Sequence, residues 1–113
     1  MRRLLAQLRP TGTSAEVLFN PSENKPYNID TIVCANGTGS PVTITIYHHA
    51  TGSTYDGTTE ILAPLVLAAK ETFHYEPRKG IADYRKAGNI AVKTSTVDSV
   101  NFTAYGEIEG ERT

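Results

Sequence analysis

The sequence predicts an all-β protein, a single antiparallel β-sandwich of jelly-roll-like form with about seven or eight short strands and an N-terminal arm. Short runs rich in Val, Ile and Thr recur along the chain, and these residues suit a pleated sheet better than a helix. Turn pairs such as Asn-Pro, Asn-Gly and Asp-Gly stand between many of the runs. At 113 residues we expect one domain, with an arm or first strand over 1–10 and the sandwich over 11–113.

The predicted strands follow one another along the chain with turns between them. The segment LLAQLR (4–9) is either an opening strand or an arm. The later strands are predicted within 14–19, 27–35, 42–49, 60–69, 71–76, 89–95 and 99–109. We interpret KGIADYRKAG (79–88) as a long loop, because it follows Pro77 and is bounded by Gly80 and Gly88. Asn36-Gly37 is interpreted as a turn at positive φ.

Side-chain alternation assigns the two faces of these strands, since neighbouring residues in an extended segment point in opposite directions. The predicted inward positions are Val42, Ile44, Ile46, His48, Ile90, Val92, Val100, Phe102, Ala104 and Ile108. The segment 60–69 is apolar on both predicted faces and is interrupted by Pro64. We therefore favour an interface with a neighbouring subunit for this segment over burial on both sides.

The stretch YHHATGSTYD (47–56) contains the residues most suggestive of a metal or catalytic site. His48 and His49 are adjacent on a predicted strand, so their imidazoles leave on opposite faces and cannot chelate one ion; His74 is the only further histidine. The sequence contains no GxSxG, HExxH or glycine-rich phosphate loop. Cys34 lies in an apolar run and is expected to be a buried side chain. We predict no catalytic, cofactor-binding or metal-binding residues, and hence no enzyme.

Charge and hydropathy exclude several classes of partner. The net charge of −1 provides no general attraction for nucleic acid or for a membrane surface, and no apolar run approaches the ~20 residues of a membrane span. MRRLLAQLRP lacks the apolar stretch of a signal peptide. We therefore expect that the protein is made in the cytoplasm and keeps this N-terminal segment. Basic residues cluster around 77–88 and at the N-terminus, which indicates either a solvated face or a charged contact surface.

The order of several short motifs resembles that of small virion-associated structural proteins of tailed bacteriophages, a family of capsid decoration and cement proteins. The motifs are QLRP (7–10), CAN (34–36), TYD (54–56), AGNIAV (87–92) and FTAYG (102–106). The resemblance extends over nearly the whole chain. It departs at YHHATG, at RKGIADYRKAG and at the C-terminal EIEGERT, which are loop and tail features that alter partner contacts. The resemblance implies a non-enzymatic structural role in the virion, after synthesis in the host cytoplasm.

The function that we expect is that of a bacteriophage capsid decoration or cement protein that stabilises the head. Its expected partners are further copies of itself, as a trimer or a dimer, and the major capsid protein or other virion proteins. The expected contact residues are Arg2, Arg3, Leu4, Leu5, Leu8, Arg9, Leu65, Leu67, Arg78, Lys79, Arg85 and Lys86.

Two alternatives stay open. One is a tail or fibre-attachment component. The other is a carbohydrate-binding β-sandwich module that stacks sugars on exposed tyrosines. The candidate tyrosines are Tyr27, Tyr47, Tyr55, Tyr75, Tyr84 and Tyr105.

Overall fold

The computed structural model describes residues 3–20, 27–49, 54–76, 81–83 and 89–108, and over these ranges the chain is built from nine β-strands without a helix. The strands are β1 (Arg3–Leu8), β2 (Glu16–Phe19), β3 (Tyr27–Asn36), β4 (Val42–His49), β5 (Glu60–Leu67), β6 (Thr72–Tyr75), β7 (Ile81–Asp83), β8 (Asn89–Thr94) and β9 (Val100–Ile108). The all-β prediction is confirmed, and each predicted run matches one strand. None of these elements is a helix that could cross a membrane.

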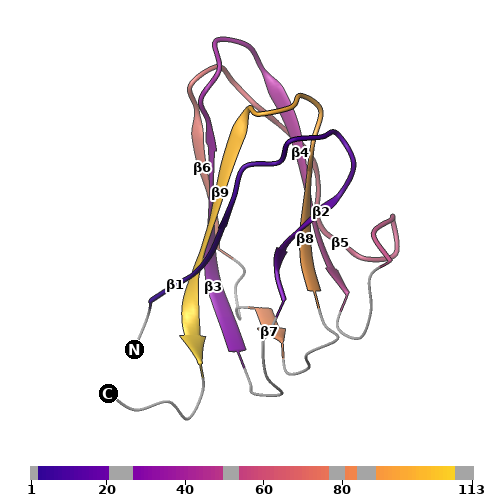
Figure 1. The fold of residues 1–113 in the computed structure, drawn as a ribbon, viewed down its shortest axis with the longest axis vertical. Helices are drawn as coiled ribbons and strands as arrows, with labels where there is room; N and C mark the ends of the chain where they lie inside the picture. The colour runs from indigo at the N-terminus through magenta and orange to yellow at the C-terminus, as the bar shows by residue number, and fades with distance from the viewer. Residues whose placement is uncertain (1–2, 21–26, 50–53, 77–80, 84–88, 109–113) are drawn as a thin grey trace.

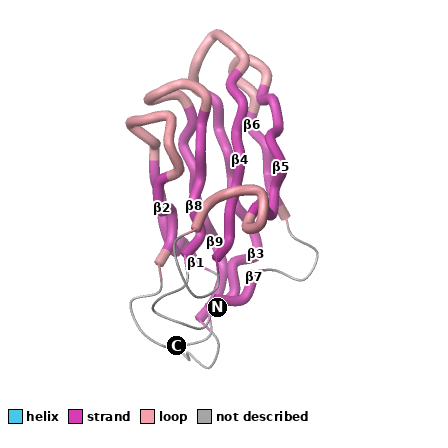
Figure 2. Tube along the Cα trace, turned by 90° about the vertical axis from the view of Figure 1, so that its right-hand side faces the viewer, coloured by secondary structure: helices cyan, strands magenta, loops and turns pink. Residues whose placement is uncertain are grey.

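The strands form two antiparallel sheets that pack face to face (Figure 1). The first sheet has the order β1-β9-β3-β6, with β7 also paired to β3, and the second has the order β2-β8-β4-β5. Figure 2 shows the four strands of the second sheet side by side. This order arises because β1 pairs with β9, β2 with β8, β3 with β6 and β4 with β5, like one long hairpin rolled up on itself. Such nested pairing is the topology of a jelly roll, as predicted.

The strand β7 lies in the segment that the sequence analysis assigned to a loop, and that assignment is wrong for residues 81–83. β7 pairs with Tyr27–Ile29 of β3, whereas β6 pairs with Ile32–Ala35. Both therefore lie along the same side of β3, one beyond the other. A three-residue strand is too short to show a period in the sequence, and its pairing with β3 is a tertiary contact.

The segment interpreted as an arm or a first strand is a strand over residues 3–8. β1 pairs along β9, from Arg3 opposite Gly106 to Leu8 opposite Phe102. Leu5, Ala6 and Leu8 are half-buried and pack against the core. Since β1 contributes both hydrogen bonds and apolar contacts, it belongs to the folded domain.

The core lies between the two sheets and contains the side chains that alternation placed inward. Ile44, Ile46, Ile90, Val92, Val100, Phe102 and Ala104 are fully buried, and Val42 is 2% exposed. His48, at the end of β4, is half-buried, and the side chain of Ile108 lies outside the described residues. Period-two alternation was thus a sound guide wherever a strand is regular.

A β-bulge in β3 reverses the alternation within that strand. The register shifts between Ile29 and Thr31, where the strand pairs with β9. Before the bulge Tyr27 and Ile29 point into the core, and after it Ile32 and Cys34 do so. The extra residue, Asp30, allows both apolar sets to face the same side, because one inserted residue changes the parity of all that follow.

Gly106 of β9 stands directly opposite this bulge. A Cβ atom at this position would overlap the backbone carbonyl oxygen of Asn28 and come within 2.9 Å of the Ile29 Cα atom. These are backbone atoms of a central strand, so they cannot move aside as a side chain could. Only glycine permits β3 and β9 to approach this closely.

At the upper end of the molecule in Figure 1, the loops 9–15, 37–41, 68–71 and 95–99 are joined by backbone hydrogen bonds. The buried side chain of Asn36 is central to this end. Its Nδ2 donates to the Ser40 and Ala68 carbonyl oxygens at 2.9 and 3.1 Å, and its Oδ1 accepts from the Thr38 backbone N–H at 3.0 Å. Asn36 thereby ties the end of β3 to the loop that follows β5 in the opposite sheet.

The expected turn at positive φ over Asn36-Gly37 is absent: Asn36 has no positive φ, and the φ of Gly37 lies outside the left-handed region. The positive φ values among described non-glycine residues are 61° at Lys70 and 50° at Asp98, in the neighbouring loops. Asn36 extends β3 and shapes the turn through its side chain, as Asn does in Asx-type turns.

We expect Gly106→Ala to lower the free energy of unfolding by about 2–3 kcal/mol, because the added methyl group collides with fixed backbone. Urea denaturation followed by circular dichroism measures this difference. Gly39→Ala is the matched control: a Cβ atom at Gly39 meets nothing within 4 Å. Equal stability of the two variants would contradict the close approach of β3 and β9.

We expect Asn36→Ala to destabilise the protein by about 1–3 kcal/mol, because it removes the donor to the Leu67 and Ala68 carbonyl oxygens and the acceptor of the Thr38 N–H. Asn101→Ala serves for comparison, since the Asn101 side chain is exposed and accepts one bond from Arg9 Nε at 3.1 Å. That variant should lie within about 0.5 kcal/mol of the parent in the same urea titration. A smaller loss for Asn36→Ala than for Asn101→Ala would refute the bridging role.

Candidate partner-binding surface

The predicted contact residues of the N-terminal segment lie on different sides of β1. Leu4 is 50% exposed on the outer face of the first sheet, where it stands opposite Tyr105. Leu5 and Leu8 are half-buried against the core, whereas Arg3 and Arg9 are exposed. The side chains of Arg3, Leu4 and Arg9 are therefore accessible at the surface, whereas those of Leu5 and Leu8 are only partly accessible.

The apolar segment of β5 is folded differently from the sequence-based expectation. Leu67 is 1% exposed and belongs to the core, so it presents no surface to a neighbouring subunit. Leu62 and Leu65 also pack against the core, because the register of β5 against β4 shifts between them at Ala63-Pro64. This irregularity turns apolar residues from both sequence parities inward. Val66, at 61% exposure, is the large apolar side chain of β5 that stays outside.

The basic residues Arg2, Arg78, Lys79, Arg85 and Lys86 lie outside the described residues. They remain contact residues by prediction.

The histidines at the end of β4 separate as strand alternation predicts. His48 is opposite Ile90, on the core side of β8, and His49 is opposite Asn89. The His49 Nδ1 atom accepts a hydrogen bond from the Thr54 backbone N–H at 2.9 Å. Among the described residues, no three His, Cys, Asp or Glu side chains lie close enough together to hold a metal ion.

Residues 54–59 form a turn that packs on the outer face of β4. The Asp56 carboxylate accepts a hydrogen bond from the Thr58 backbone N–H at 2.8 Å, and hydrogen bonds from Thr58 hold the pKa of this carboxyl below its usual value. The Tyr55 ring lies 6.0 Å from that of Tyr47. This contact covers Tyr47, which is 5% exposed although it points away from the core.

None of the described tyrosines is fully exposed, as the carbohydrate-binding alternative would require. Tyr27 and Tyr47 are buried, and Tyr55, Tyr75 and Tyr105 are half-buried. Burial raises the pKa of Tyr47, Tyr55 and Tyr75, and the Tyr75 hydroxyl donates to the Ile61 carbonyl oxygen at 2.9 Å. Tyr84 lies outside the described residues. Sugar stacking needs an accessible ring face, so the alternative loses its structural basis among the described tyrosines.

Cys34 is buried in β3, as predicted. Its side chain is fully buried, and burial raises the pKa of the thiol to about 12. The thiolate is the reactive form of cysteine, and at neutral pH its population here is negligible. Cys34 is a core side chain and has no features of a nucleophile.

Several open hollows adjoin β1, and one of about 450 Å³ is lined by Gln7, Leu8, Arg9, Asn101, Phe102 and Thr103. On the outer face of the first sheet, a hollow of about 570 Å³ is lined by Arg3, Leu4, Thr31, Val33, His74 and Tyr105. Its lining mixes apolar, polar and basic side chains, without a carboxylate. Val33, His74 and Tyr105 are surface neighbours of Leu4 that no local sequence pattern indicates, because β3, β6 and β9 come together only in the sheet.

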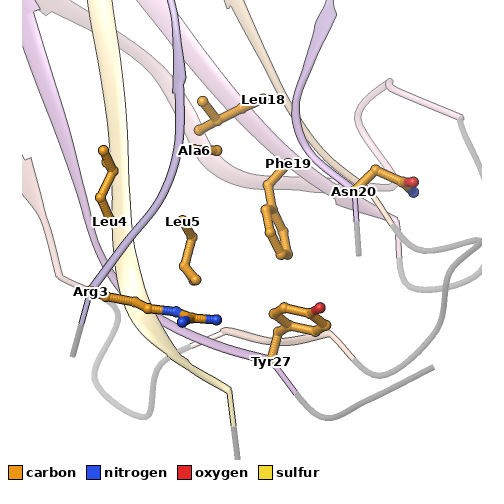
Figure 3. A pocket seen from close by; sticks show the side chains of 8 residues that line it. All are labelled: Arg3, Leu4, Leu5, Ala6, Leu18, Phe19, Asn20 and Tyr27. Atoms are coloured by element: carbon orange, nitrogen blue, oxygen red, sulfur yellow. The ribbon is translucent and has the colours of Figure 1, made fainter. Parts of the chain in front are cut away.

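A further hollow lies where the edges of the two sheets face each other. We call it the β1–β2 groove. It has a volume of about 480 Å³ (Figure 3) and is lined by Arg3, Leu4, Leu5, Ala6, Leu18, Phe19, Asn20 and Tyr27. The Phe19 and Tyr27 rings meet edge to face, with centroids 5.3 Å apart, and form its inner wall. Three of the predicted contact residues, Arg3, Leu4 and Leu5, thus gather at one surface feature.

No protein-family model and no curated protein matches the sequence. Among solved structures, a chain in the structure of infectious bursal disease virus, Gx strain, is similar in fold, with a TM-score of 0.51 and 14% sequence identity. The similarity covers 99% of this chain and 33% of the viral chain, so the present protein spans about one third of the length of that chain. At this identity the likeness concerns the fold alone.

We expect Cys34 to resist alkylation by iodoacetamide at pH 8 in the folded protein and to react rapidly in urea, because burial withholds the thiolate. Mass spectrometry of timed samples measures the reaction.

The raised pKa of the Cys34 thiol also means that the folded state retains this proton above pH 9. The contribution of Cys34 to stability is therefore complete below pH 9 and declines as the pH rises from 9 towards 12. Cys34→Ala should show a shallower decline over this range, and fast labelling of the native protein would disprove the burial.

Proposed function

We propose that this protein is a non-enzymatic structural component of a virion, and that it acts as a capsid decoration or cement protein of a tailed bacteriophage. The observation that carries the proposal is the complete jelly-roll topology, which runs through the whole described chain. Jelly rolls are common in viral capsid proteins, and also in lectins and cupins. The fold of a chain in infectious bursal disease virus supports the viral choice.

The surface also supports a binding role over catalysis. The hollows beside β1 are open and lined by side chains of mixed character, whereas small-molecule sites are concave and enclose most of the ligand. Cys34 is buried with a raised pKa, and the adjacent His48 and His49 point to opposite faces of β4. These are features of a module that docks on other proteins.

A cement role needs only a modest affinity at each site. A protein that binds the assembled shell but not its separate subunits stabilises the shell by RT ln(1 + [L]/Kd), which is about 2.7 kcal/mol per site at a concentration of 100 Kd. A capsid repeats the same site over its entire lattice, so the total stabilisation grows with the number of copies. Such an interface uses charged and apolar side chains. These are supplied by the exposed contact residues Arg3, Leu4 and Arg9 and by the predicted basic residues of 77–88.

The number of copies per particle tests the proposal. Particles of the phage that carries the gene would be purified, and the protein quantified by mass spectrometry against isotope-labelled peptides. We expect hundreds of copies per particle, in a simple ratio to the major capsid protein. A few to a few dozen copies would indicate the tail or fibre alternative instead, and absence from the particle would refute a virion role.

The same particles provide a functional control. Virions from a deletion strain should release their DNA at a lower temperature than the parent, and purified protein added back should restore the parental temperature. Unchanged thermal release would contradict the cement role even if the protein were abundant.

A further inference from the structure

Asn36-Gly37 is the Asn-Gly pair of this chain, and the sequence holds no second one. An Asn followed by Gly is especially prone to spontaneous deamidation, because glycine has no Cβ atom to hinder the reacting backbone. Asn36 has no positive φ, so the turn expected at this pair does not account for it. How the fold holds the atoms of the pair therefore decides whether it reacts.

The reaction takes place within the chain. The Gly37 backbone nitrogen attacks the Asn36 side-chain carbon Cγ, so that an N–Cγ bond forms and the Cγ–Nδ2 bond breaks. The proton of the Gly37 N–H leaves with the amide group as ammonia, and the chain is left with a cyclic succinimide. Water then opens the ring at either carbonyl group, which gives aspartate or isoaspartate at position 36. The sequence supplies both reacting groups, and water is the one co-reactant.

Hydrogen bonds engage both reacting groups in the folded protein. The Gly37 N–H donates to the Ser99 carbonyl oxygen at 2.9 Å. The Asn36 side chain is buried, its Nδ2 donates to the Ala68 carbonyl oxygen at 3.1 Å, and its Oδ1 accepts from the Thr38 hydroxyl at 2.8 Å. Ring closure requires these bonds to break, because the nitrogen must lose its proton and the side-chain amide must leave its place.

We propose that Asn36-Gly37 is a deamidation site that the fold keeps unreactive, so that unfolded chains acquire aspartate or isoaspartate at position 36 while folded chains retain asparagine. The reaction then proceeds through opened chains, and its rate under native conditions falls with their fraction. For small domains that fraction is on the order of one in a thousand or less. The inference goes beyond the virion role and does not depend on it.

Neither product fits the native site. An aspartate at position 36 has no Nδ2 donor, and it places a carboxylate beside the Ser40, Leu67 and Ala68 carbonyl oxygens. An isoaspartate lengthens the backbone by one atom at the position where Asn36 pairs with Val100 of β9. Both changes destabilise the folded state, so the longer a chain stays unfolded, the less completely it returns.

The first experiment compares the full chain in native buffer with the same chain in urea, at mildly alkaline pH and with a thiol reductant. Peptide mapping by mass spectrometry, with enzymatic methylation of isoaspartate, measures the conversion of Asn36. We expect conversion at least about 100-fold faster in urea, because native conversion scales with the opened fraction. A synthetic peptide of residues 33–40 in both buffers corrects for urea itself. A smaller ratio would show that the folded site reacts and would overturn the proposal.

The Gly37→Ala variant separates deamidation from other damage in urea. A Cβ atom at position 37 lies 3.8 Å from the Ser99 carbonyl oxygen, which is an ordinary contact, so the variant should fold. Its methyl group hinders the attacking nitrogen, and we expect conversion in urea to slow by about tenfold, which corresponds to a modest rise in the barrier. After increasing times in urea, the parent should regain less and less native circular dichroism on dilution, whereas Gly37→Ala should regain nearly all. Equal losses in the two proteins would overturn the link between deamidation and refolding.

The Asn36→Asp variant reproduces one product without any time in urea. We expect its urea midpoint to lie below that of the parent, because the carboxylate replaces the buried amide donor. A midpoint equal to the parent's would overturn the claim that the product does not fit. This measurement and the comparison of the parent in two buffers test the proposal even if Gly37→Ala does not fold.

Discussion

The fold depends on the antiparallel pairing of β3 with β9, because every other strand of the first sheet is added to this pair. The two strands come from positions far apart in the chain, residues 27–36 and 100–108, and their inward side chains form much of the core. Their close approach requires Gly106, and the bulge beside it brings Tyr27, Ile29, Ile32 and Cys34 to one side. A short-range irregularity thus permits a long-range pairing.

The same rolled arrangement places β1 and β2 at the edges of opposite sheets. In a jelly roll the first two strands end opposite sheets, so β1 and β2 face each other without a sheet between them. The core beneath is closed by Leu18, Phe19 and Tyr27, while the strand edges remain open to a partner. At the other edges, the β5 irregularity around Pro64 and the shortness of β6 discourage further pairing.

Two departures from expectation arise from features outside the regular alternation of a strand. The sequence of β5 is apolar at both parities, and we interpreted this as a subunit interface, yet the register shift turns Leu62, Leu65 and Leu67 inward. Tyr47 occupies an outward position as expected, yet contact with Tyr55 buries it. In both cases alternation was assigned correctly for a regular strand. Neither the register shift in β5 nor the contact between Tyr47 and Tyr55 has a reliable pattern in a single sequence.

The sequence by itself determined the all-β class, the place of eight strands, and the burial of Cys34, because these follow from local propensity and period-two alternation. It also separated His48 from His49. Only the tertiary structure decided the register shifts, the ninth strand, the requirement for glycine at 106 and the joining of Arg3, Leu4 and Leu5 with Phe19 and Tyr27 in one groove. Each of these arises where segments distant in the chain meet, and no local pattern encodes that meeting.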